Sequence, residues 1–250
     1  PSKILILAPG EELAADMTEM APYVNVADTD EQFQANLTDD FEIYLSDIMT
    51  AGNNTNNSDM AAYVSQNSEE AKDWLADTLG MEYGDLAQEA GSSVARSFPA
   101  KEGNLNELAQ EALLKKVEEL KIPVEYKAEL KSVAYDEEGA LDRITVTVDG
   151  KDQEIDCLAL VATDVSLIPV FEESQVYEAD GKAAALVVSN NAEQLNKDSG
   201  ELINGLYAAG PILSAAVDGE GVLSGNELTE AVMFGSTAGT EAAVYVSDNQ

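Results

Sequence analysis

The sequence contains no histidine and only one cysteine among its 250 residues. The lack of histidine removes the commonest general base and the commonest metal ligand. With Cys157 as the only thiol, an intrachain disulfide is excluded and a structural zinc site is not expected. Cys157 stands in the apolar stretch CLALVAT, so we expect it to be a small buried apolar side chain. We therefore predict no metal site, and any ion that did bind would be a hard cation held by carboxylates.

Basic residues are also scarce. The chain has 13 lysines and arginines against 48 aspartates and glutamates, which gives a formal net charge of −35. This charge repels phosphate backbones and anionic lipid headgroups, so nucleic acid and membrane surfaces are not expected partners. Cationic partners, cations or a salt-rich environment fit better. Because the acidic residues are spread along the whole chain and are not gathered in a tail, they are more typical of an adaptation to habitat or for solubility than of a binding site.

Long apolar runs are absent as well. No segment approaches the roughly 20 apolar residues that span a bilayer, and no charged-then-apolar leader opens the chain. We expect a soluble protein, cytoplasmic by default, with a trimmed or exported form left open. The hydrophobic content of 45% is enough for a substantial core. The length allows one large domain or two modest ones.

The first thirty residues predict a βαβ unit. KILIL, residues 3–7, is a continuous apolar run typical of a buried parallel strand. Residues 11–20 have the apolar spacing of a helix, and YVNVAD, residues 23–28, predicts a second strand that ends at Asp28.

The middle of the chain is expected to be mainly helical. A polar loop over 48–59 precedes a helix over 68–79 that ends at Gly80, and residues 81–103 are the best candidate for a linker or irregular crossover. Residues 104–121 form the clearest helix, with an apolar face that predicts packing in the core. Asn104 and Glu107 have the spacing of a helix start.

The second half changes to a period of two. Residues 124–135, 142–150 and 152–163 predict strands joined by the turns DEEG and DGKD, which together form a meander or hairpin that leads into a last buried strand. GLYAAG, residues 205–210, predicts a further strand, followed by a Gly- and Asp-rich loop and a long helix from about Asn226. Ser224 and Glu227 have the spacing of a capping box at the start of that helix.

These segments, above all GLYAAG…SGNELTEAVMFGSTAG over residues 205–239, resemble the flavoprotein family of fumarate reductases and flavocytochrome c-type FAD oxidoreductases. The resemblance implies an α/β class: a single Rossmann-like, FAD-binding-type domain over 1–250, with a parallel sheet, a β-meander insertion and a C-terminal helix. It also implies that residues 81–103 are a shortened remnant of the region in which the family has its capping domain.

The resemblance further implies where FAD contacts would lie. In the family a Gly-x-Gly-x-x-Gly sequence brings the diphosphate to a helix start, and its glycines fall here on Leu7, Pro9 and Glu12. A strand-end glycine falls on Asp164, and the acid that holds the ribityl chain falls on Pro211. Bulk and negative charge at these positions oppose an anionic cofactor.

The residues that would contact FAD, if it were retained, are Gly10, Asp28, Gly225 and Asn226. The family histidine and arginine that bind a dicarboxylate substrate fall on Asp218 and Val222. Since a dicarboxylate needs cationic partners, we predict no catalytic residue. Arg96, one of only two arginines, is expected to be a salt-bridge partner and not a proton donor.

We interpret the chain as a degenerate member of this family: a non-catalytic binding or assembly protein, such as a scaffold, with a strongly acidic surface and no cofactor. A protein partner or self-assembly is expected. The alternative is an FAD-dependent oxidoreductase of the fumarate reductase type with altered cofactor contacts. A second alternative is an acidic carrier of small ligands or hard cations that uses the loops 136–139 and 218–221.

Overall fold

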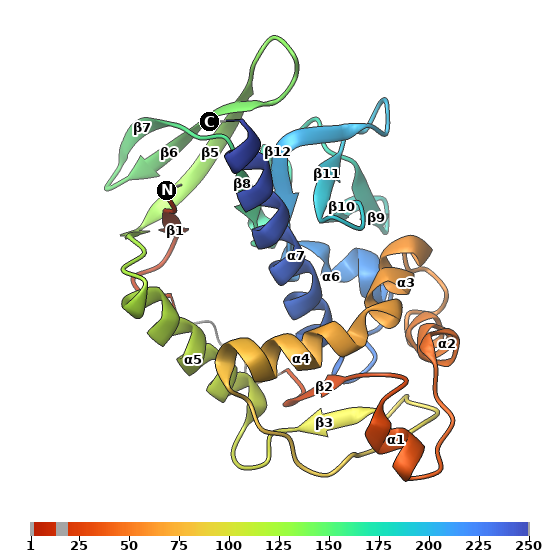
Figure 1. The fold of residues 1–250 in the computed structure, drawn as a ribbon. Coiled ribbons are helices and arrows are strands. Elements are labelled where there is room, and N and C mark those ends of the chain that lie inside the picture. The colour runs from red at the N-terminus through yellow and green to blue at the C-terminus, as the bar shows by residue number, and fades with distance from the viewer. Residues whose placement is uncertain (1–2, 14–19, 250) are drawn as a thin grey trace.

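The computed structural model describes residues 3–13 and 20–249, which form a mixed α/β structure (Figure 1). Helix α7 (Asn226–Asp248) crosses the molecule from β2 (Tyr23–Asn25) to the end that carries the β-meander. The expected α/β class and the long C-terminal helix are confirmed. The described part of the chain has no helix with the length and apolar character needed to cross a bilayer.

The strands predicted near the N-terminus exist, but their pairing differs from a βαβ unit. β1 (Ile6–Ala8) pairs in parallel with β4 (Val124–Tyr126), whereas β2 pairs antiparallel with β3 (Ser97–Pro99). The prediction that the first two strands form one βαβ unit is therefore wrong for the described residues. β3 comes from 81–103, which local patterns had assigned to a linker, so it could not be recognised as a partner. The helix expected over 11–20 lies largely outside the described residues, because 14–19 are not included.

The predicted meander is confirmed. β5, β6 and β7 form an antiparallel sheet, and β12 lies between β8, which is parallel to it, and β11, which is antiparallel. A separate hairpin is formed by β9 and β10. These strands are β5 (Ala128–Tyr135), β6 (Leu141–Val148), β7 (Lys151–Asp156), β8 (Leu160–Ala162), β9 (Val176–Ala179), β10 (Lys182–Leu186), β11 (Glu193–Leu195) and β12 (Leu202–Ala208).

Most predicted helices are confirmed in place, and two shorten the predicted loop at 48–59. The helices are α1 (Asp30–Gln34), α2 (Phe41–Ala51), α3 (Ser58–Gln66), α4 (Ser68–Leu79), α5 (Leu105–Glu119) and α6 (Pro211–Asp218), with a 3-10 helix η1 (Val165–Val170). Helices α1, α2 and α3 were not predicted from the sequence, and neither was α6. Its first residue is a proline, which suits a helix start because the missing N–H would have no partner within the helix.

Helix α5 begins as expected but packs less than expected. The Asn104 side chain accepts hydrogen bonds from the backbone of residues 106 and 107, which caps the helix. Leu105 and Ala109 lie in the core, while Leu113 and Leu120 are 45% and 68% exposed. The fully buried residues of α5 thus belong to its first turns.

Two apolar clusters meet at α7. The larger lies around β12 and α6, with Leu206, Ile212 and Phe234 fully buried. The smaller lies between β2, β3 and α4, and includes Met233 of α7. Cys157 is half-buried at the edge of the larger cluster, and burial raises the pKa of its thiol to about 11. Because α7 faces a core on two sides, polar side chains near its start are also buried.

Candidate functional site at the start of helix α7

The start of α7 is held against β2 by hydrogen bonds. Gly225 is its N-cap, and the side chain of the preceding Ser224 points to β2, with its Oγ 2.6 Å from the Tyr23 hydroxyl oxygen. The Asn25 amide donates to the Ser224 carbonyl at 2.8 Å. The predicted capping box of Ser224 and Glu227 is therefore wrong, because the serine hydroxyl bonds to Tyr23 and no side chain caps the helix.

The polar groups of β2 in this region also have partners. Thr229 Oγ1 of α7 accepts from the Asn25 backbone N–H at 2.9 Å and lies 3.1 Å from the Asn25 carbonyl oxygen. The Ser97 hydroxyl donates to the Asn25 side chain at 2.7 Å. Asn25, Ser97 and Thr229 are fully buried. Buried backbone groups need partners, and α7 supplies them to β2 as a neighbouring strand would.

Asn226, the second residue of the predicted FAD contact at this helix, is fully buried. Its side-chain oxygen accepts a hydrogen bond from the Tyr44 hydroxyl at 2.8 Å, and its side-chain nitrogen donates to Asp218 Oδ1 at 3.1 Å. Both ends of the amide therefore have protein partners. The structure brings Gly225 and Asn226 together, but it surrounds them with β2, α2 and the end of α6.

Two carboxyl groups, those of Asp218 and Glu230, lie buried beside this start, at 2% and 3% exposure. The Ser214 hydroxyl donates to Glu230 Oε1 at 2.6 Å. Burial raises the pKa of Asp218 to about 7. Burial and then the neighbouring Asp218 charge raise the pKa of Glu230 well above its ordinary value, and burial raises the pKa of Glu227 as well.

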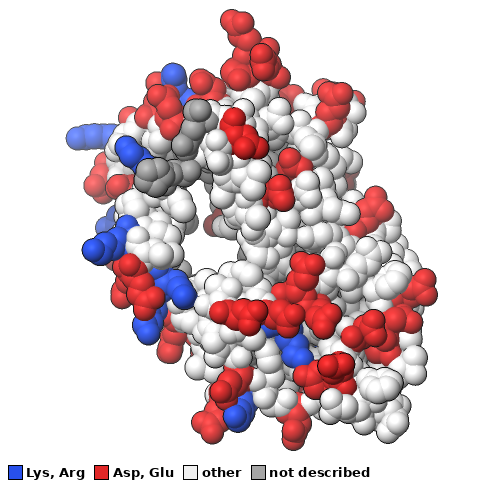
Figure 2. Space-filling model, in the orientation of Figure 1, with Lys and Arg blue, Asp and Glu red and all other residues white. Residues whose placement is uncertain are grey.

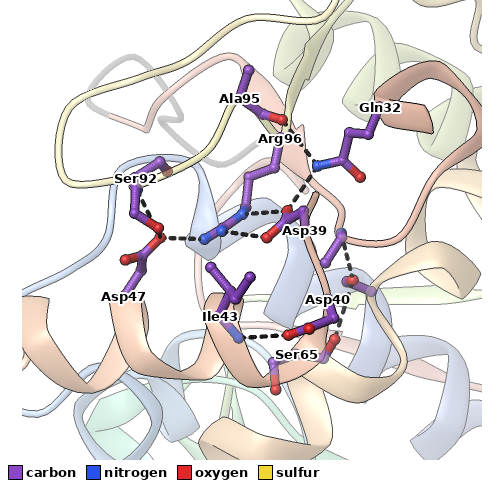
Figure 3. A network of polar contacts seen from close by, with 12 residues as sticks. Gln32, Asp39, Asp40, Ile43, Asp47, Ser65, Ser92, Ala95 and Arg96 are labelled. Atoms are coloured by element: carbon purple, nitrogen blue, oxygen red, sulfur yellow. Dashed lines mark hydrogen bonds and ion pairs between the residues drawn. The ribbon is translucent and has the colours of Figure 1, made fainter. Parts of the chain in front are cut away.

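The other side of Tyr44 faces a buried ion-pair network, shown in Figure 3. The Arg96 guanidinium forms a two-bonded pair with Asp39, from Nη2 at 2.7 Å and Nε at 3.0 Å, and a third bond from Nη1 to Asp47 at 2.6 Å. The guanidinium carbon lies 4.7 Å from the centre of the Tyr44 ring. Asp47 also accepts from the backbone and hydroxyl of Ser93, both at 2.8 Å. The prediction that Arg96 is a salt-bridge partner is confirmed.

The two other predicted contact residues lie on different elements. Gly10 follows β1, and its carbonyl accepts from the Lys127 backbone at 3.0 Å. Glu11 beside it forms an exposed ion pair with Lys127 at 2.8 Å. Asp28 follows β2, is exposed and has a left-handed backbone with φ of 60°. Neither residue has a described contact with Gly225 or Asn226.

The remaining positions implied by the family resemblance do not fit FAD. Asp164 caps η1, its carboxylate accepting from the Ser166 backbone at 2.8 Å. Pro211 begins α6 and has no polar side chain, and Val222 is 48% exposed. Asp218, at the other substrate position, is a buried acid. With the start of α7 closed by β2, the described residues do not reproduce the contacts expected for this cofactor.

Sequence reasoning missed Tyr44, Asp39, Asp47 and Glu230. The signal for the two aspartates was available, because a lone arginine in an acid-rich chain is expected to pair with nearby acids. Glu230 gave no such signal, because it is two positions from Leu228 and from Val232, and residues two apart on a helix point to different sides. No local pattern indicates which residue would lie opposite it.

No protein-family model and no curated protein matches the chain. Solved structures do. A flavocytochrome c3 fumarate reductase in an open conformation matches with a TM-score of 0.76 and 12% identity, over 96% of this chain and 74% of that one. A 3-ketosteroid-Δ4-(5α)-dehydrogenase from Rhodococcus jostii RHA1 matches with a TM-score of 0.74 and 13% identity, over 96% and 91%.

A quinol fumarate reductase chain from E. coli matches with a TM-score of 0.70 and 12% identity. The match covers 100% of this chain and 66% of that one. At these identities the comparisons concern the fold alone. The fold of this chain is similar to FAD-binding flavoprotein folds, as the sequence resemblance implied.

Proposed function

We propose that this chain is a non-catalytic binding or assembly protein built on a flavoprotein-type fold. The observation that carries the proposal is the closed start of α7, where Tyr23, Tyr44 and Asp218 bond to Ser224 and Asn226. A helix start with free N–H groups attracts anions, but one surrounded by protein groups and buried acids does not. In this proposal the chain keeps the frame of the fold, and its own side chains take the bonds at the start of α7 that a ligand would otherwise use.

The charge of the surface supports binding to a cationic partner or to a second copy. Figure 2 shows groups of acidic side chains at many points of the visible face, whereas lysines and arginines gather mostly along the edge that carries α5. That edge includes Lys115, Lys116 and Lys121, all exposed. Opposite charges on two parts of one surface favour association and steer it at low salt.

We expect the purified protein to be colourless in the visible range and to show no saturable quenching of flavin fluorescence when FAD is titrated. Flavin absorption that survives purification and gel filtration would contradict the proposal. In that case the alternative, an FAD-dependent oxidoreductase of the fumarate reductase type with altered contacts, would become the better reading. The fold similarity to the flavocytochrome c3 fumarate reductase supports this alternative.

Self-assembly through opposite charges is expected to depend on salt. Light scattering coupled to size exclusion should give a larger mass at low ionic strength than at about 1 M salt, where the Debye length is only about 3 Å. If the mass equals that of one chain at every salt concentration, the protein does not assemble with itself. The partner would then be a separate cationic protein. Adding lysine-rich peptide and measuring binding tests that case directly.

The third possibility, an acidic carrier, has one feature in its favour. An open groove of about 610 Å³ lies between the β5–β6 turn, β7 and the end of α7, and Asp136, Glu138, Asp142 and Asp156 line it. However, Asp136 already accepts from the backbone of its own turn at 2.9 Å. Among residues 3–13 and 20–249, no three acidic or cysteine side chains are grouped as metal ligands.

A further inference from the structure

The interface between α6 and α7 contains a four-residue frame. Ser214 and Asp218 are one turn apart on α6, and Asn226 and Glu230 are one turn apart on α7. Two hydrogen bonds join the helices: Ser214 to Glu230 Oε1 at 2.6 Å, and Asn226 to Asp218 Oδ1 at 3.1 Å. Each carboxyl group thus uses one oxygen for a bond to the opposite helix.

The other two oxygens are unpartnered. Asp218 Oδ2 and Glu230 Oε2 are both buried, and neither has a hydrogen-bond partner among the residues that the structure describes. Members of the frame on the same helix are about 5–6 Å apart. The two bonds between the helices put Asp218 and Glu230 at opposite corners of the frame, close enough for the charge of Asp218 to raise the pKa of Glu230. Two ionised carboxylates in such a place would repel strongly in low dielectric, and a buried acceptor without a donor is costly.

A single proton on the two carboxyl groups removes one of the two negative charges and supplies the missing hydrogen-bond donor. We propose that Asp218 and Glu230 share one proton across the α6–α7 interface, and that its loss loosens the junction of the two helices. The protonated carboxyl group donates to the free oxygen of the other, which turns two unpartnered acceptors into one hydrogen bond. Two carboxyl groups that share a site hold one proton more tightly than either does alone.

The surrounding charges favour this state. Glu227 of α7 adds negative charge near both acids, which holds the proton more firmly. Tyr44 of α2 faces the pair through Asn226, and the positive charge of Arg96 lies on the far side of its ring, where Asp39 and Asp47 neutralise it. Burial raises the pKa of both acids, in agreement with the geometry.

The sign of the pH dependence follows from linkage. Above the ordinary carboxyl pKa the unfolded chain has lost both protons, whereas the folded protein keeps one, so stability falls as pH rises until the folded pair also ionises. Burial raises the pKa of Asp218 from 3.8 to about 7, which places the fall between about pH 4 and about pH 7 or above. Since the chain has no histidine, the side chains that titrate in the upper part of this range are mainly acids whose pKa is raised by burial, such as Glu193 and Glu227.

The test compares urea unfolding of the wild type with Asp218→Asn and Glu230→Gln between about pH 5 and about pH 8. We expect the wild type to lose stability with rising pH and each single variant to lose most of that dependence. An amide can supply the hydrogen that the proton supplied, and without the charge of the second acid the pKa of the remaining acid falls toward its ordinary value. The protection of residues 214–230 from hydrogen exchange, relative to the intrinsic exchange rate at each pH, should fall with rising pH in the wild type alone.

The control is Glu193→Gln on β11, which removes a different partly buried acid whose pKa burial also raises. Glu193→Gln should keep the part of the pH dependence of stability that is due to Asp218 and Glu230. If the two acids titrated independently, Asp218→Asn and Glu230→Gln would each keep half of the pH dependence of stability that the wild type shows. That result would overturn the proposal. Stability restored at high pH by sodium chloride but not by choline chloride would also overturn it, because a metal ion would then bridge the pair.

If a variant does not fold, the proposal can still be tested on the wild-type protein. Infrared spectra should show the carbonyl stretch of a neutral carboxylic acid at pH about 7, which disappears on reversible alkaline titration. The absence of that band in the folded protein would overturn the proposal. Neither readout depends on flavin, so the result is separate from the test of the proposed function.

Discussion

Arg96→Ala is expected to lower the free energy of unfolding by about 3–5 kcal/mol, because removing one member of a buried ion pair leaves the other buried and uncompensated. The Asp39 side chain is fully buried and forms two of the three bonds to the guanidinium. The substitution also removes the cation from the face of Tyr44. Urea unfolding at neutral pH measures the change.

The only other arginine in the chain provides the matched control. Arg143 contacts Asp142, Glu154 and Asp156, but its side chain is 40% exposed. Exposed ion pairs contribute little to stability because solvent screens them, so Arg143→Ala should lower the free energy of unfolding far less than Arg96→Ala. Equal losses for the two variants would show that burial of the Arg96 network does not determine its contribution.

Gly225→Ala is expected to lower the free energy of unfolding by about 2–4 kcal/mol. The backbone φ of Gly225 is 86°, a left-handed conformation that costs a residue with a Cβ about 1–2 kcal/mol. The added Cβ would also overlap the ring of Tyr23, and overpacking typically costs about 1–3 kcal/mol. The variant therefore tests whether β2 lies against the start of α7.

Gly150→Ala separates the two causes. Gly150, in the β6–β7 turn, has a similar φ of 74°, but a Cβ there would meet no atom within 4 Å. Gly150→Ala should lower the free energy of unfolding only by the cost of backbone strain, about 1–2 kcal/mol. If both variants lose the same amount, the Tyr23 ring is not packed on Gly225, and the closed start of α7 that supports the proposed function would be in doubt.

The sequence predicted elements well where the determining interactions are local. The Asn104 side chain caps α5 from within the same turn, and the meander has two short turns between strands of period two. Both are present where they were expected. The capping box of Ser224 and Glu227 had the same kind of local support, yet it is wrong. The Tyr23 hydroxyl, from 201 positions away, bonds to the serine instead.

The candidate site was predictable only in part. Gly225 and Asn226 were identified, as was the role of Arg96 as a salt-bridge partner. Their partners, including Tyr44 and Asp218, depend on how α2, α6 and β2 pack around α7. Glu230 was missed because a glutamate in a helix is usually exposed, and its burial depends on α6, which the sequence analysis did not identify.

The sequence by itself determined the charge of the surface, the absence of histidine, the period-two meander and the long C-terminal helix, because these depend on composition or on residues a few positions apart. Only the tertiary structure decided that β2 pairs with β3, that the start of α7 is closed, and that two acids share a frame at the α6–α7 interface. The physical reason is that hydrogen-bond partners and burial arise between segments as much as 200 residues apart, such as Asn25 and Thr229, which are separated by 204 positions. No local pattern specifies which of the many possible contacts of this kind gives the lowest free energy.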